Sequence, residues 1–249
     1  MLDLFLSEFK RYRTIALLIC FLHGVIWAVS NKFIPFMMPH PFKMMGITFL
    51  AVIGGGVFGL ASIALHKRKN HWTYLIHRPL APGKIYLAMV SAGLALLFIS
   101  VCLPFLASVT FLDLFSNNVV EARHYFMALH IFLMTGCAYF IGVYAVLSPI
   151  KSALLAIVLM QYIAHAVKAP VGFDILVDLI FFGFTFYLAR SVFQINLNLL
   201  NLGKPIIFAS VLALQPAMLL LLVSAPSVYY HLPLKLIGMH PHSETVAPG

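Results

Sequence analysis

The sequence predicts an all-α fold, a polytopic transmembrane helical bundle of six to seven spans. Of its 249 residues 62% are hydrophobic and only 9% are charged, whereas soluble domains carry about 25% charged residues. The apolar residues form long continuous runs, which argues against the alternating pattern of a barrel strand. Lipid accommodates such runs as helices of about 20 residues, because backbone groups in lipid must pair internally.

The first segment, residues 1–13, has a pattern of its own. Leu2, Phe5, Phe9 and Tyr12 recur at helical spacing, and the segment ends in a basic cluster. This predicts an amphipathic helix that lies on the cytoplasmic membrane surface. The alternative is that these residues are simply the polar start of the first span.

The transmembrane domain is expected over residues 14–225. Its seven apolar runs are 14–30, 46–66, 86–111, 124–148, 152–168, 172–189 and 205–225. The fifth run is short, so it is either a short span or part of a broken pair with the sixth. Residues 226–249 are polar and rich in proline, and they are expected to be an external tail or the link to a longer chain.

The net charge of +9 is explained by topology rather than by nucleic-acid binding, because Lys and Arg concentrate on the cytoplasmic side of membrane proteins. With a cytoplasmic N-terminus, eleven basic residues fall inside: Lys10, Arg11, Arg13, Lys67, Arg68, Lys69, Arg78, Lys84, Lys151, Arg190 and Lys204. Five fall outside: Lys32, Lys43, Arg123, Lys168 and Lys235. The N-terminus is therefore expected in the cytoplasm.

The most basic stretch, residues 67–84, is then a cytoplasmic loop. Asn70 is suited to cap a short helix, and Trp72, Leu75 and Ile76 share one side of it at spacings of three and four. The Arg78-Pro79 step ends this helix. An apolar helix face in the cytoplasm needs a cover, which is either a partner protein or the membrane surface.

Residues 74–87 read Tyr-Leu-Ile-His-Arg-Pro-Leu-Ala-Pro-Gly-Lys-Ile-Tyr-Leu. Together with the amphipathic start and two preceding spans, this segment resembles the membrane (permease) subunit of an ABC transporter of the type-two exporter class, over residues 1 to about 110. The family has six spans with a broken fifth helix, whereas this chain has seven runs. That departure leaves the C-terminal topology open.

The resemblance implies several partners and one site. The loop would be a coupling helix that docks on an ATP-binding cassette ATPase subunit and transmits its closure, with ATP and Mg on that partner. A second permease copy or homologue, membrane lipid and a bacterial inner membrane are implied as well. The residues expected to couple to the ATPase are Trp72, Tyr74, Leu75, Ile76, Arg78 and Pro79.

No phosphate-binding loop is evident. Gly54-Gly55-Gly56 lies within a span and lacks a following Lys-Ser or Lys-Thr pair. ATP hydrolysis is therefore expected on another polypeptide, with no enzymatic activity in this chain. Ala51, Gly55 and Gly59 repeat every fourth residue, which predicts a close helix-packing face.

Polar residues inside the runs are candidates for the translocation path. Asp174 and Asp178 are four apart and share a helix face, and Gln161 belongs to the fifth run. An intramembrane acid is a functional candidate. Asp178 is expected to line a polar path, to couple protons, to pair with a base such as Lys168, or to serve structure.

Two alternative functions stay open. The first is an ion-coupled carrier that acts through Asp178. The second is a membrane-embedded haem or metal enzyme that uses the intramembrane residues His23, His130 and His165. Ligation requires convergent pairs on facing helices, and no pair within one run has ligand spacing, so neither metal nor cofactor is expected in this chain. The cargo and its direction are open.

Overall fold

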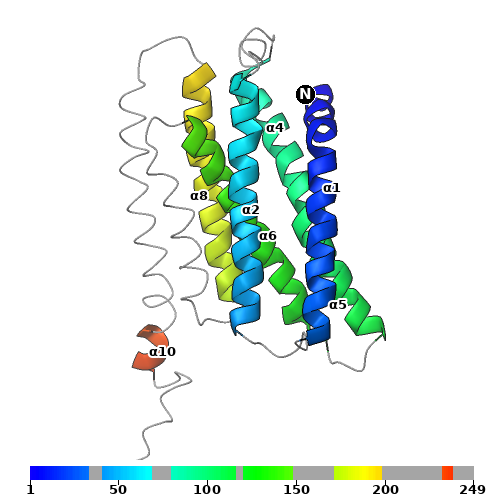
Figure 1. Ribbon diagram of the computed structural model, residues 1–249. Helices are drawn as coiled ribbons and strands as arrows, with labels where there is room; N and C mark the ends of the chain where they lie inside the picture. The colour runs from blue at the N-terminus through cyan, green and yellow to red at the C-terminus, as the bar shows by residue number, and fades with distance from the viewer. Residues whose placement is uncertain (34–40, 69–79, 116–119, 148–170, 198–231, 238–249) are drawn as a thin grey trace, which may run out of the picture.

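The computed structural model describes residues 1–33, 41–68, 80–115, 120–147, 171–197 and 232–237. Their elements, in chain order, are α1 (Leu2–Phe33), α2 (Pro41–Arg68), α4 (Pro82–Leu97), the π-helix η1 (Phe98–Cys102), α5 (Leu103–Phe115), α6 (Ala122–Leu147), α8 (Val171–Leu197) and α10 (Leu232–Leu236). No strand occurs within these ranges. The described part of the chain is thus all-α, as predicted (Figure 1).

Three stretches are long and apolar enough to cross a membrane: Pro82–Phe115, Ala122–Leu147 and Ile175–Phe193. A shorter apolar helix covers Leu50–His66. These are the helices of a membrane protein. The predicted runs 152–168 and 205–225 lie outside the described residues, so the count of six to seven spans stays a prediction.

Helix α1 has no break at the predicted boundary between residues 13 and 14. It continues from Leu2 to Phe33 as one helix, and the row Leu4, Glu8, Tyr12 and Ala16 is buried. A spacing of four keeps this row on one side of the helix, and the side packs against the bundle. The helix therefore starts as part of the bundle, while a position of residues 1–13 on the membrane surface stays a prediction.

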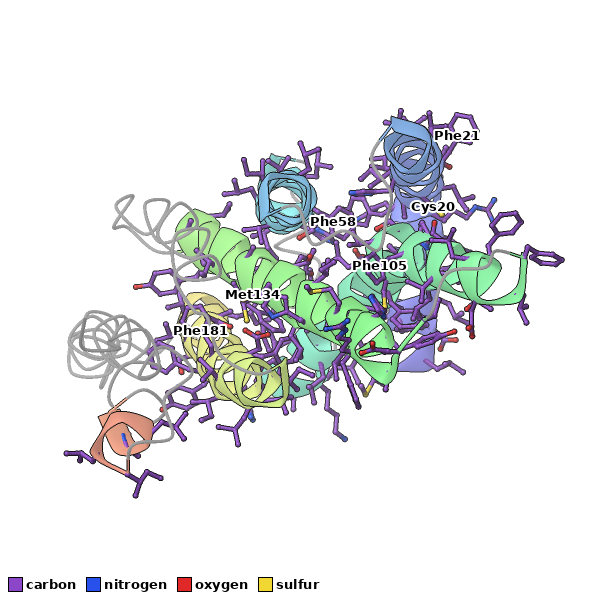
Figure 2. The ribbon with its side chains drawn as sticks, turned by 90° about the horizontal axis from the view of Figure 1, so that it is seen from below. Cys20, Phe21, Phe58, Phe105, Met134 and Phe181 are labelled. Atoms are coloured by element: carbon purple, nitrogen blue, oxygen red, sulfur yellow. The ribbon has the colours of Figure 1, made fainter. Side chains whose placement is uncertain are left out.

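Helices α2, α6 and α8 run parallel to one another and opposite to α1 and α4 (Figure 1). Helix α6 lies between α2 and α8 and packs along both. Met134 of α6 and Phe181 of α8 share one buried cluster (Figure 2). Phe105 is buried in another, whereas Phe21 of α1 points outward and is 68% exposed, as expected of a lipid-facing side chain.

The Pro82–Phe115 span is interrupted by η1, which ends two residues before Pro104. Proline lacks a backbone N–H and its ring collides with the carbonyl four residues earlier, that of Ser100. A π-helical turn is one way to accommodate this conflict within a helix. The distorted turn lies where α1 contacts the Pro82–Phe115 span.

Candidate functional site

The predicted coupling residues lie outside the described part of the chain, because residues 69–79 are not described. The loop's flanks are described. Helix α2 ends at Arg68, and α4 begins at Pro82, with proline in the first turn where its missing N–H costs nothing. Both flanks lie at the end of the bundle where the N-terminus lies (Figure 1). We call this the loop-side end.

A buried polar network joins α1 to the last turn of α2 at the loop-side end. The Nε2 atom of His66 lies 3.1 Å from Glu8 Oε1 and 2.8 Å from a terminal nitrogen of Arg11. The same arginine nitrogen lies 3.5 Å from Glu8 Oε1. On the other side of the ring, Nδ1 lies 2.6 Å from the Ser62 carbonyl oxygen, which also accepts a hydrogen bond from the Tyr12 hydroxyl at 3.2 Å.

Exposure differs sharply within this network. The side chains of His66 and Glu8 are 2% and 7% exposed, whereas that of Arg11 is 34% exposed. Beside Glu8 lies a cavity about the size of one water molecule, which the hydroxyl-bearing residues Tyr12, Ser62 and Tyr139 also line. The network thus has a buried part and one arm, Arg11, that reaches solvent.

The predicted small-residue face of α2 lies against α6. A Cβ atom at Gly55 would collide with the backbone carbonyl oxygen of Thr135, and one at Gly59 with that of Tyr139. Ala51 is fully buried on the same row. Glycine therefore permits the two backbones to approach closely, which is how membrane helices gain packing energy without a hydrophobic driving force.

Asp178 lies on α8 and is buried. Its Oδ2 atom lies 2.6 Å from Nδ1 of His130 on α6, and the two side chains are 8% and 14% exposed. The predicted alternative partner, Lys168, lies outside the described residues. The structure therefore pairs this buried acid with an imidazole. His130 and Asp178 lie in the first halves of α6 and α8, which begin at the end of the bundle opposite the loop-side end (Figure 1).

Sequence reasoning missed this pair, although a signal for it existed. His130 comes six residues after residue 124, where one predicted run starts, and Asp178 comes six residues after residue 172, where another starts. Both runs are predicted to start on the same side of the membrane, so equal counts put both residues at equal depth. Of the other path candidates, Asp174 lies in the first turn of α8, and Gln161 lies outside the described residues.

The described residues contain no cluster of side chains suited to bind a metal ion. Within the described ranges, no group of three or more His, Cys, Asp or Glu side chains is placed to hold a metal ion. His23 is buried on α1 and lies against the backbone of Ser100 in η1. His130 is the partner of Asp178, and His165, the third candidate histidine, lies outside the described residues.

Comparison with protein-family models, with curated proteins and with solved structures found no match to this chain.

Proposed function

We propose that this chain is the permease subunit of an ABC transporter. It would form the translocation pathway in a bacterial inner membrane with its N-terminus in the cytoplasm, paired with a second permease copy or homologue. Separate ATPase subunits would bind and hydrolyse ATP with Mg. Their closure would move the predicted helix at Trp72 to Arg78 and switch the spans between two states.

One observation carries this proposal. The basic 67–84 loop separates two long apolar helices, and its sequence carries the Trp72, Leu75 and Ile76 row followed by Arg78-Pro79. The described helices support it by bringing both flanks of the loop beside the N-terminal part of α1. A helix that docks on an ATPase and moves would thereby pull on α1 and α2 together.

The test is co-purification of the tagged full chain from its native membrane. We expect an ATP-binding cassette subunit to be recovered with it. Changing Leu75→Asp and Ile76→Asp together should lower this recovery more than about tenfold, because buried apolar anchors dominate interface energy.

A matched control inserts the same charge at the other end of the bundle. Leu114 and Phe115 are 69% and 73% exposed at the end of α5, and Leu114→Asp with Phe115→Asp should leave ATPase recovery unchanged. The proposal fails if no such subunit is recovered from wild-type membranes, or if the loop variant retains both the subunit and transport.

The His130–Asp178 pair favours a second candidate, an ion-coupled carrier. A carboxylate and an imidazole 2.6 Å apart inside a bundle are the kind of buried polar pair that marks ion pathways in membrane proteins. Under this candidate, Asp178→Asn abolishes transport, and transport follows an ion gradient without ATP. Transport in proteoliposomes that contain this chain alone separates the two candidates.

A further inference from the structure

The contacts of His66 contain a conflict of hydrogen-bond roles. The Ser62 carbonyl oxygen can only accept, so the Nδ1 atom 2.6 Å away carries a hydrogen. Whether the ring is neutral or positively charged then depends on whether Nε2 also carries a proton. That atom faces an arginine nitrogen at 2.8 Å, which can only donate, and a carboxylate oxygen at 3.1 Å, which can only accept.

A single Nε2 atom cannot serve both neighbours. Without a proton it accepts from Arg11 and repels the Glu8 oxygen. With a proton it donates to Glu8 and repels Arg11. The two arrangements are therefore mutually exclusive, and the proton on Nε2 selects between them.

The exposure of the partners shows which one moves. Arg11 is about one third exposed, whereas Glu8 is buried, so protonation of the ring would release the arginine into water and retain the carboxylate. The buried group stays electrically neutral in both arrangements, as Glu8 with Arg11 or as Glu8 with the imidazolium. A buried site that remains neutral avoids the large cost of an uncompensated charge.

We propose that Nε2 of His66 is a proton-binding site that links α1 to the end of α2 in two alternative arrangements. The described titratable groups that face it are Glu8, Arg11 and Tyr12 from α1, with Tyr139 from α6 across the adjoining cavity. Helix α4 contributes Met89, Ala92 and Gly93 to that cavity. Because α2 ends two residues after His66, the proton would decide whether the last turn of α2 is bound to α1 through Arg11 or through Glu8.

The inference does not depend on the proposed function, and its test needs no ATPase. The full chain, labelled with ¹⁵N-histidine and held in lipid nanodiscs, is titrated by NMR between about pH 5 and 8. The His66 signal is assigned by its loss in His66→Gln. We expect a neutral ring protonated at Nδ1 at the high end and a ring protonated on both nitrogens at the low end.

Two variants that each remove one charge beside His66 sharpen the test. At the pH where the wild-type signal is half converted, Glu8→Gln should lower the ratio of doubly to singly protonated rings and Arg11→Gln should raise it, each on the order of tenfold. Arg13→Gln, the same charge change at an exposed position of α1, should leave the ratio unchanged. A neutral ring protonated at Nε2, shifts in one direction for both variants, or no conversion in this range would overturn the proposal.

Discussion

The two ends of the bundle each bury a carboxylate beside an imidazole, yet the two are built differently. At the loop-side end, Glu8 has both His66 and Arg11 within reach, and the arginine is partly in solvent. At the opposite end, Asp178 is hydrogen-bonded to His130, and both side chains are largely enclosed between α6 and α8.

What each cluster can do depends on how many basic side chains lie beside its carboxylate and on how exposed those side chains are. With two partners, one of which can leave, a network changes arrangement without stranding a charge. A largely enclosed pair has no such freedom, because loss of His130 removes the described partner of the buried Asp178 carboxylate. We therefore expect the loop-side network to be adaptable and the His130–Asp178 pair to act as a rigid tie between α6 and α8.

The largest effect should come from breaking that tie. His130→Ala removes the described partner of a buried carboxylate, so it should lower the free energy of unfolding in mixed micelles by about 3–5 kcal/mol. Replacing both residues with leucine should recover most of the loss, because it also removes the stranded charge. A cost below about 1 kcal/mol for the single change would contradict a rigid tie.

A smaller loss should follow from pushing apart the helices between the two ends. Gly59→Ala sets a methyl group against the Tyr139 backbone, and overpacking of this kind costs about 1–3 kcal/mol. Gly54 is the matched control, because a Cβ there meets nothing within 4 Å. Unfolding measurements should find Gly54→Ala neutral or slightly stabilising, and equal costs at both glycines would mean that the contact is not tight.

At the loop-side end, Glu8→Gln should cost less than the break at His130. The amide keeps the size of the side chain and can still accept a hydrogen bond, so we expect a loss of about 1–2 kcal/mol in the same unfolding assay. Asp3→Asn, an exposed change on the same helix, should stay within about 0.5 kcal/mol. A loss as large as that of His130→Ala would erase the distinction between the two ends.

The smallest expected effect is the coupling between the ends. His66→Gln and Asp178→Asn alter groups that share no described contact, so their unfolding costs should add within about 0.5 kcal/mol. A double-mutant cycle measures this directly. A larger interaction energy would show that the parallel helices α2, α6 and α8 transmit strain from one end to the other.

The sequence was sufficient for the fold class and for the apolar helices, because composition and run length reflect the solvent around the chain. It was also sufficient to place Gly55 and Gly59 on one helix face, since that depends on local periodicity. The Glu8–His66 and His130–Asp178 contacts depend on which helices become neighbours, and periodicity within one helix carries no such information. The π-helical turn before Pro104 likewise depends both on the proline and on how this span packs against α1.

The π-helical turn also affects which face of the Pro82–Phe115 span packs against the neighbouring helices. Leu97, Val101, Phe105 and Val109 are four residues apart and all buried. A regular α-helix rotates such a row by about 40° at each step, and the wider turn at Phe98–Cys102 reduces that rotation where the row crosses it. A π-helical turn uses about one residue more than an α-helical turn. One residue deleted within Phe98–Cys102 would therefore let this part of the span become a regular α-helix, shorten the span by about one residue's rise, and leave Phe105 and Val109 facing nearly the same side.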